Sequence, residues 1–521
     1  MMEYVLLQAV FLPLLLSPLA YLLGKKLGPN AVAWFTFGLL LYCTTIMIVP
    51  VFSGTYEEHY PWTKLFGEFG FLLDGLASPF AIIIYVISTV LALFSKPYMV
   101  AKITSQFEER MNKQKQVIGD GSSTAIIESS SLKGYLNNQI GVYFALFLVM
   151  AMGMLGTVLA TNLIEFYVFF EVMLIPAFFM IAFWGYEEKR RIALLFFFWT
   201  HVGAVVLLLG FLAIGLNVGS FNFADIKEHG IPPNILSLAA AAIIIGLGVK
   251  MAAFILHIWL PHFYRAAPTP LNALSSGAML GIGAYGLFRL LIMLLPGQYE
   301  HFALYLNLWG IITMIYGGVM ALMQDDIKKL FAYSSISQMG YIIFGIGSSS
   351  VLGLSGAEML FVSHSLGKVL LFMMVGAIIL QVGTRSITKM GGLAGKMPIT
   401  AVCAFIGALT IMGIPPTSGF MAEWTLFYGA LQTAVQQGST IRMIAFGLGL
   451  VATVITMAYI LWMIKRVFFG KLPEHLEKTK EASWYVTAPM MVLAGFTIVV
   501  GIYPDVFFNQ IIPFMKGVMG V

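Results

Sequence analysis

The stretch "GVKMAAFILHIWLPHF" at residues 248–263 carries one lysine, Lys250, in the middle of an apolar run, and His257 follows seven residues later. The whole chain has 521 residues, of which 59% are hydrophobic and 10% are charged. Soluble domains carry about a quarter charged residues. This chain has too few polar side chains to cover its apolar surface in water, so we expect it to fold in a lipid bilayer.

Apolar segments of about 20 residues, long enough to span a bilayer, recur along the chain. They predict an all-α integral membrane protein with about 14 transmembrane helices. The predicted spans lie near 4–24, 31–52, 75–95, 139–160, 162–184, 191–216, 236–258, 270–295, 302–323, 328–347, 356–382, 398–434, 440–467 and 485–507. The segment at 398–434 is too long for one straight helix. It contains "GIPPTSG", whose prolines remove backbone donors, so we expect a helix that is broken within the membrane.

Basic residues collect in the connections that follow odd-numbered spans, which hold 22 of the 29 lysines and arginines. One such connection contains Lys328 and Lys329. Even-numbered connections and adjoining helix ends hold only Lys64, Lys227, Arg289 and Arg442. Because cytoplasmic loops are enriched in basic residues, we expect a multi-pass protein of the cell membrane with both termini on the non-cytoplasmic side. This distribution also explains the net charge of +5 without a nucleic-acid partner.

The longest polar stretch, at 96–138, is predicted to be a flexible or partner-facing cytoplasmic connection. The two cysteines, Cys43 and Cys403, lie inside apolar runs and are expected to be packing residues. The sequence shows no metal-ligand cluster and no glycine-rich phosphate loop beside a strand. It therefore does not predict a soluble catalytic domain.

Several ionisable residues remain inside the predicted spans, where each charge costs about 3 kcal/mol. Two pairs have helical spacing: Lys250 with His257, and His364 with Lys368. The candidate proton-relay residues are Glu171, Lys250, His257, His364, Lys368 and Glu423. The lysines and glutamates fall near the middle of their spans, which independent ion pairs would not require. A buried lysine can change charge when a carboxylate moves, and histidine can pass protons. The structural alternative is an ion pair that joins helices, or a lysine that reaches the interface.

Motifs spread over most of the chain resemble those of a known family. They include "FLLDGLASPF" at 71–80, "FYVFFEVMLIP" at 166–176, "GVKMAAFILHIWLP" at 248–261, "QDDIKKLFAYSSISQMGYI" at 324–342, "HSLGKVLLF" at 364–372 and "GIPPTSGFMAEW" at 413–424. With them the chain resembles the antiporter-like membrane subunits of respiratory complex I and of multisubunit cation/proton antiporters. The resemblance is greatest to the M type of NADH:quinone oxidoreductase, called chain 4 in mitochondria.

The resemblance implies fourteen helices with two inverted five-helix repeats, and with the seventh and twelfth helices broken. We accordingly expect three N-terminal helices and a cytoplasmic loop, a first repeat, a second repeat and a C-terminal helix, at 1–138, 139–295, 302–467 and 485–521. The seventh-helix break is expected near Pro261. Glu171 is similar to the fifth-helix glutamate that partners the seventh-helix lysine, here Lys250. Glu423 is similar to the twelfth-helix carboxylate of the M type, and His364 and Lys368 resemble the eleventh-helix pair.

Two motifs depart from the family. The lysine that usually precedes "GAYG" in the eighth helix is Gly281 here, so the relay lacks its usual bridge. Water, His257 or Lys368 would have to replace it. In "WLPHFYRAAPTP", His262 and Ala266 replace acids and Arg265 adds a base, which makes the cytoplasmic access route near the seventh helix more positive.

The resemblance implies a proton-translocating subunit of a complex I-like respiratory oxidoreductase, an enzyme only as part of that translocase. No cofactor is expected on this chain; iron–sulfur clusters and flavin are expected on partner subunits. The expected partners are homologous antiporter-like membrane subunits, other subunits of the assembly and membrane lipids. The alternative is a subunit of a multisubunit cation/proton antiporter or a membrane-bound hydrogenase complex, which shares Glu171 and Lys250. A stand-alone transporter with broken helices and a pure scaffold are the remaining alternatives.

Overall fold

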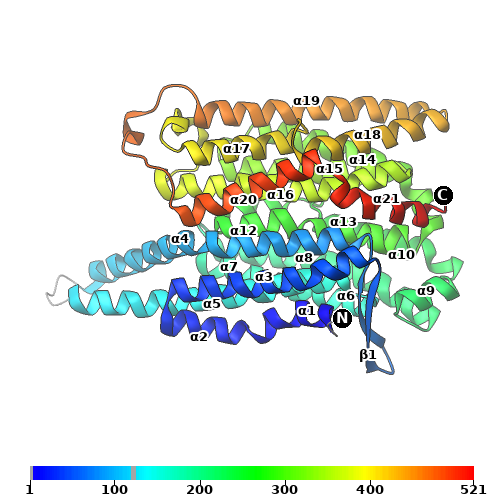
Figure 1. The fold of residues 1–521 in the computed structure, drawn as a ribbon, viewed down its shortest axis with the longest axis horizontal. Helices are drawn as coiled ribbons and strands as arrows, with labels where there is room; N and C mark the ends of the chain where they lie inside the picture. Colours follow the sequence, from blue (N-terminus) through cyan, green and yellow to red (C-terminus); the bar gives the residue numbers. More distant parts are fainter. Residues whose placement is uncertain (1–3, 119–124) are drawn as a thin grey trace.

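The structure, a computed structural model, describes residues 4–118 and 125–521. Figure 1 shows long helices that lie side by side, with the beginning of α1 and the C-terminus at the same end of the bundle. The N-terminal elements are α1 (Val5–Leu15), α2 (Ser17–Leu27), α3 (Pro29–Ser53), strands β1 (Tyr56–Thr63) and β2 (Gly67–Leu73), α4 (Ala77–Ile118) and α5 (Ala125–Leu159).

The central part of the chain is helical and interrupted several times. Its elements are α6 (Leu163–Val172), α7 (Leu174–Trp184), α8 (Lys189–Val218), α9 (Phe223–His229), α10 (Pro233–Lys250), α11 (Trp259–Ala266), α12 (Thr269–Leu274), π-helix η1 (Ser275–Met279), α13 (Gly281–Gly286) and π-helix η2 (Leu287–Ile292). Residues 269–292 form one apolar path that is buried throughout. Such wide π turns inside helices are frequent at functional sites.

The C-terminal part contains the longest buried helix, α16, and ends with two helices. Its elements are α14 (Pro296–Leu322), α15 (Ile327–Ile346), α16 (Val351–Val382), the short 3-10 helices η3 (Ile387–Lys389) and η4 (Leu393–Gly395), α17 (Pro398–Ile411), α18 (Ser418–Gln436), α19 (Thr440–Phe468), η5 (Glu474–Leu476), α20 (Trp484–Ile502) and α21 (Asp505–Met519).

Membrane-spanning helices dominate the described part of the chain. Eleven helices are long and apolar enough to cross a membrane, and α1 with α2, bent by 40°, makes a twelfth candidate. The predicted total of 14 stays a prediction. Two further candidates are α15, which begins with charged residues, and the pair α17 and α18. Neither helix of this pair is both long and apolar enough to cross a membrane alone.

Both predicted helix breaks are present. The break between α17 and α18 covers residues 412–417, at the predicted prolines. The other covers residues 251–258, before Pro261, which lies in the first turn of α11, where proline is tolerated. The break thus lies near Pro261, as predicted, but it ends before the proline. Ala252 and Ile255 adopt positive φ angles of 52° and 76° in this break.

The described parts of the 96–138 stretch are helical, which contradicts a flexible connection and leaves the partner-facing alternative a prediction. Helix α4 continues to Ile118 and α5 begins at Ala125, so both extend far beyond the bundle, toward the left of Figure 1. Side-chain pairs one turn apart support this polar helix; Lys113 Nζ donates to Glu109 at 2.6 Å. The part of the predicted connection at 119–124 lies outside the described residues.

Three basic residues assigned to loops or helix ends are buried. Arg289 binds Asp74 through two hydrogen bonds of 2.7 Å, with side chains 3% and 6% exposed. Lys328 Nζ donates to the carbonyl of Ala267 at 2.8 Å. Arg442 donates to the carbonyl of Gly347 at 2.8 Å. The surface-charge interpretation of these three residues is wrong, because a distant partner satisfies each one inside the bundle.

Asp74 and Arg289 provide a test of internal packing. Asp74→Ala should lower the free energy of unfolding by about 3–5 kcal/mol, because it leaves a buried guanidinium without its carboxylate. Unfolding in mixed detergent micelles measures this change. The matched control is Glu188→Ala, which removes the exposed ion pair with Arg191 and should cost about 0–1 kcal/mol. Equal effects of the two substitutions would contradict the buried pair.

Candidate functional site

Lys250 ends helix α10 and is 1% exposed. Its Nζ lies 4.7 Å from the centroid of the Phe170 ring and makes no hydrogen bond to the described residues. The C-terminal end of a helix favours a cation, and an aromatic face does the same. Lys250 is therefore held in a site that tolerates its charge without a fixed hydrogen-bond acceptor.

The acid next to Phe170 is bound elsewhere. Glu171 Oε2 lies 3.0 Å from Nδ1 of His201 on α8, while Oε1 is buried without a hydrogen bond to the described residues. Glu171 is also close enough to Lys250 for their charges to interact. The carboxylate thus lies between two bases. The sequence analysis gave His201 no role, although its place within a predicted span was a signal.

The break after Lys250 is stabilised by tryptophan side chains. The indole N–H groups of Trp259, Trp199 and Trp309 donate to the carbonyls of Val249, Leu256 and Phe254 at 3.0, 2.9 and 3.2 Å, respectively. Inside a bilayer, free backbone groups need partners from the protein. These three bonds let the helix end inside the bundle and so fix the position of Lys250.

His257 belongs to the break and not to the face of a helix. Its Nε2 lies 3.0 Å from the hydroxyl of Tyr316 on α14, and its Nδ1 is buried without a hydrogen bond to the described residues. The prediction that Lys250 and His257 share one helix face is wrong, because α10 ends at Lys250. His257 instead lies between this break and α14, which begins the second half of the bundle.

Helix α16 carries the second pair at the predicted spacing. His364 and Lys368 are 1% and 0% exposed. Lys368 Nζ donates to Ser334 Oγ at 2.5 Å and to the Phe331 carbonyl at 3.3 Å. Ser334 Oγ lies 2.8 Å from the hydroxyl of Tyr459 on α19. A continuous hydrogen-bonded path therefore runs from Lys368 through Ser334 to α19.

Glu423 lies beyond that path, on α18. It lines a cavity of about 370 Å³ between α18 and α19. A methyl group at Gly413, which has a φ of +64°, would lie 2.5 Å from Glu423 Oε2. The break at 412–417 thus leaves room for the carboxylate. Glu423 lies within electrostatic range of Tyr459, the residue at which the path from Lys368 ends.

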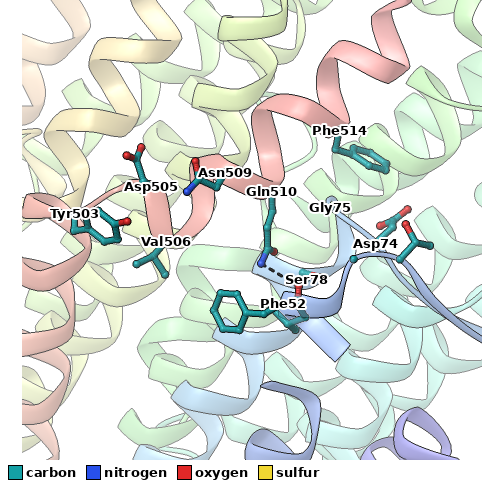
Figure 2. A pocket seen from close by; sticks show the side chains of 13 residues that line it. Phe52, Asp74, Gly75, Ser78, Tyr503, Asp505, Val506, Asn509, Gln510 and Phe514 are labelled. Carbon is teal, nitrogen blue, oxygen red and sulfur yellow. Dashed lines mark hydrogen bonds between the residues drawn. The ribbon is translucent and has the colours of Figure 1, made fainter. Parts of the chain in front are cut away.

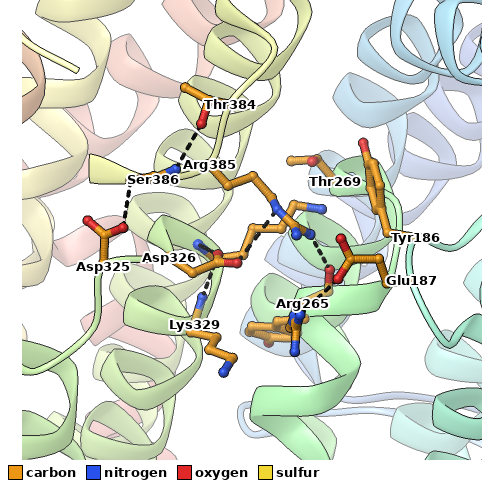
Figure 3. A network of polar contacts seen from close by, with 12 residues as sticks. Tyr186, Glu187, Arg265, Thr269, Asp325, Asp326, Lys329, Thr384, Arg385 and Ser386 are labelled. Carbon is orange, nitrogen blue, oxygen red and sulfur yellow. Dashed lines mark hydrogen bonds and ion pairs between the residues drawn. The ribbon is translucent and has the colours of Figure 1, made fainter. Parts of the chain in front are cut away.

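A charged junction joins the connections at the end of the bundle opposite the termini (Figure 3). Arg265 pairs with Glu187 at 2.8 Å and Arg385 with Asp326 at 3.6 Å. The Tyr186 ring carries three cations, with Lys102, Lys328 and Arg385 at 3.5, 4.7 and 5.3 Å from its centroid. The basic residues of this junction were predicted to lie in cytoplasmic connections, but their pairing with Glu187, Asp326 and Tyr186 was not predicted.

The opposite end contains a separate cavity of about 550 Å³, shown in Figure 2. It is lined by the end of α3, the start of α4, and α21. Asp74 lines it, as do Ser78 and Gln510, and Gln510 Nε2 donates to the Val51 carbonyl at 3.1 Å. The bonds between Asp74 and Arg289 connect this cavity to the buried π-helix η2.

Gly281, at the position where the resembling family has lysine, packs directly on α16. A methyl group there would lie 2.0 Å from Cε2 of Phe361. Phe361 in turn stacks on Phe80 of α4, with ring centroids 4.1 Å apart. A lysine at 281 would overlap Phe361. The two residues thus form a matched small-and-large pair between α13 and α16.

Gly281→Ala should therefore lower the free energy of unfolding by about 1–3 kcal/mol through overpacking. Phe361→Leu should relieve part of that loss when the two changes are combined, because it shortens the opposing side chain. Unfolding in detergent gives both values. Gly495→Ala is the matched control; no atom lies within 4 Å of its added methyl group, so it should change stability by about 0–1 kcal/mol. Full stability of Gly281→Ala would disprove the close packing.

Comparisons with known proteins agree with this architecture. The sequence profile of the family described as NADH:quinone oxidoreductase/Mrp antiporter matches residues 160–456. F(420)H(2) dehydrogenase subunit M of Methanosarcina mazei is 34% identical over 377 residues, which are 70% of this chain and 74% of that protein. NADH-quinone oxidoreductase subunit M of Rickettsia bellii is 35% identical over 63% of this chain; the match spans 66% of the Rickettsia protein, just under two thirds.

Two solved structures have the same fold. A chain of respiratory complex I from Thermus thermophilus with bound NADH superposes with a TM-score of 0.81, at 25% identity and with 99% of each chain covered. A chain of the archaeal membrane-bound sulfane sulfur reductase superposes with a TM-score of 0.78, at 26% identity, over 96% of this chain and 77% of that one. The buried lysines, the broken helices and these matches lead to one conclusion: this chain belongs to the NADH:quinone oxidoreductase/Mrp antiporter membrane-subunit family.

Proposed function

We propose that this chain is the proton-translocating M-type membrane subunit of a complex I-like respiratory oxidoreductase. The observation that carries the proposal is Lys250, which is buried at the end of a broken helix with no hydrogen bond to the described residues and with Glu171 nearby. An intramembrane ionisable residue without a fixed partner indicates a transport pathway more than a structural ion pair.

The relay follows from the charges. When Glu171 turns from His201 toward Lys250, it stabilises the ammonium form; when it turns back, Lys250 releases its proton in a dry site. His257, hydrogen-bonded to Tyr316, carries the proton toward the second half. His364 and Lys368 pass it along the Ser334 and Tyr459 hydroxyls to Glu423.

The membrane arrangement is part of the proposal. Fourteen spans would comprise two inverted repeats at 139–295 and 302–467, flanked by the segments 1–138 and 485–521. The breaks at 251–258 and 412–417 then belong to the seventh and twelfth spans. The end with the charged junction faces the cytoplasm, and both termini lie on the non-cytoplasmic side of the membrane.

Redox chemistry takes place on partner subunits in this proposal. The relatives are named as subunits of dehydrogenases and quinone oxidoreductases. Iron–sulfur clusters and flavin belong to those partners, and this chain holds no cofactor and catalyses no reaction alone. The likeness to the sulfane sulfur reductase chain favours one alternative, a hydrogenase- or antiporter-type assembly. Identification of the co-purifying subunits separates the two: a quinone-site subunit supports the first.

The relay predicts a specific pattern of mutant effects. Lys250→Met and Glu171→Gln should each strongly lower the number of protons pumped per electron. The double variant should be little worse than either, because both residues act in the same relay. The assay is proton uptake by proteoliposomes that contain the whole complex, normalised to electron transfer.

Lys516→Met is the matched control, because this exposed lysine lies on α21, away from the relay; it should pump normally. Native gels confirm that each complex assembles. An assembled Lys250→Met complex with a normal proton-to-electron ratio would falsify the relay and leave Lys250 a structural residue.

The orientation is tested by cysteine labelling with a membrane-impermeant maleimide. Lys113→Cys, near the tip of the α4 projection, should react only from the cytoplasmic side, and Lys227→Cys on α9 only from outside. Both positions are exposed, whereas the native Cys43 and Cys403 are buried and give little background. The reverse pattern of labelling would overturn the orientation.

A further inference from the structure

Glu358 on α16 is a buried acid that was not among the predicted site residues and has no role in the proposed relay. It is 0% exposed, and both of its carboxylate oxygens lack a hydrogen bond to the described residues. A buried carboxyl group without partners costs several kcal/mol, whether it is charged or neutral. Leucine would pack at such a position without this cost, so the acid calls for an explanation other than packing.

Glu358 belongs to a line of polar groups along one face of α16. One face of α16 carries side chains at intervals of three, four and three residues: Glu358, the apolar Phe361, Ser365 and Lys368. His364 lies four residues before Lys368. The Ser365 hydroxyl and both ring nitrogens of His364 are also buried without hydrogen bonds to the described residues. The unsatisfied groups therefore continue from the relay toward Glu358.

The opposing surface is the interrupted helix at 269–292. A methyl group at Gly277 in η1 would lie 3.3 Å from the Ser365 carbonyl, and Gly281 lies against Phe361. The Ser275 hydroxyl of η1 also has no hydrogen bond to the described residues. The interface between the two helices thus has polar groups on either side of the Phe361 ring.

Beyond Phe361, Glu358 lies within electrostatic range of Asp74 and Arg289, and Asp74 lines the cavity of Figure 2. Tyr285, which accepts a hydrogen bond from Arg289 at 2.9 Å, is within the same range of Glu358. Arg289 stabilises an ionised Glu358, while Asp74 opposes it. With Glu358 protonated, the net charge of Asp74, Arg289 and Glu358 is zero. With Glu358 ionised, their net charge is one negative charge.

We propose that Glu358 takes up a proton from the His364 end of α16, past Phe361, and releases it through the Asp74–Arg289 group to the cavity at the end of the bundle where the termini lie. This second outlet branches from the path to Glu423 and depends on the proposed proton translocation. Only a proton moves: the carboxylate gains it from one side and returns it on the other.

Two substitutions separate proton transfer from shape. Glu358→Gln keeps the size of the side chain but cannot be deprotonated. It should lower the number of protons pumped per electron by a smaller share than Lys250→Met, because the path to Glu423 stays open. Glu358→Asp keeps the carboxyl group on a shorter chain, and it should retain most of the pumping. A role in packing alone predicts the reverse order, and that order overturns the proposal.

Ser355→Ala is the matched control. Ser355 is also buried on α16, one turn before Glu358, and its hydroxyl has no hydrogen bond to the described residues; the variant should pump normally. If Lys250→Met lowers the number of protons pumped per electron and Glu358→Gln leaves it unchanged, only the Glu358 outlet is wrong. If both variants pump normally, the proposed function itself fails.

A measurement on the unmodified complex supports the variants. Redox-difference infrared spectra should show a protonated-carboxyl band that changes during turnover and shifts when glutamate is labelled with carbon-13 in its side-chain carboxyl group. Loss of part of this band in Glu358→Gln assigns it. If the wild-type complex shows no such band, the proposal is overturned even where a variant does not assemble.

Discussion

The absence of water from the hydrocarbon core constrains every feature of this molecule. A helix that stops in mid-membrane exposes carbonyls that only the protein can satisfy. At the break after Lys250, three tryptophan indoles supply those bonds. The same constraint keeps Arg289 on Asp74 and Lys328 on a backbone carbonyl. The buried polar groups without partners among the described residues are therefore exceptions; Ser355, Glu358, His364 and Ser365 on α16 are among them, as is Lys250 at the end of α10.

Composition and hydropathy were sufficient to predict a helical membrane protein, and the prolines at 415 and 416 located one break. The positions of Lys368 and Glu423 could also be anticipated, since charges inside apolar runs are visible in the sequence. Arg289 could not be placed, because its partner Asp74 is 215 residues away. Residues 251–258 contain no proline or glycine to mark a break; its stability comes from tryptophans on other helices. The polarity of 96–138 suggested a loop, but a helix projecting into water is polar too.

The two halves of the bundle handle their lysines differently. Lys250 lies over an aromatic ring without a hydrogen-bond acceptor among the described residues, whereas Lys368 donates to a serine hydroxyl and a carbonyl. A lysine held in this way loses its hydrogen bonds when it moves. Proton transfer from Lys368 would therefore depend on rotation of the Ser334 and Tyr459 hydroxyls. The contrast suits a relay in which charge movement in the first half drives hydroxyl rearrangement in the second. Phe361 of α16 occupies the space against α13 that Gly281 leaves free.

Helix α4 joins distant parts of the molecule mechanically. At 42 residues it is about 63 Å long, and one end stands outside the bundle while Phe80, near the other, stacks on Phe361. A rod of this length is stiff, so a force applied at its exposed tip produces torque at its buried end. A neighbouring subunit bound to the exposed tip would therefore transmit force along α4 to Phe361, without contacting any ionisable residue of the interior.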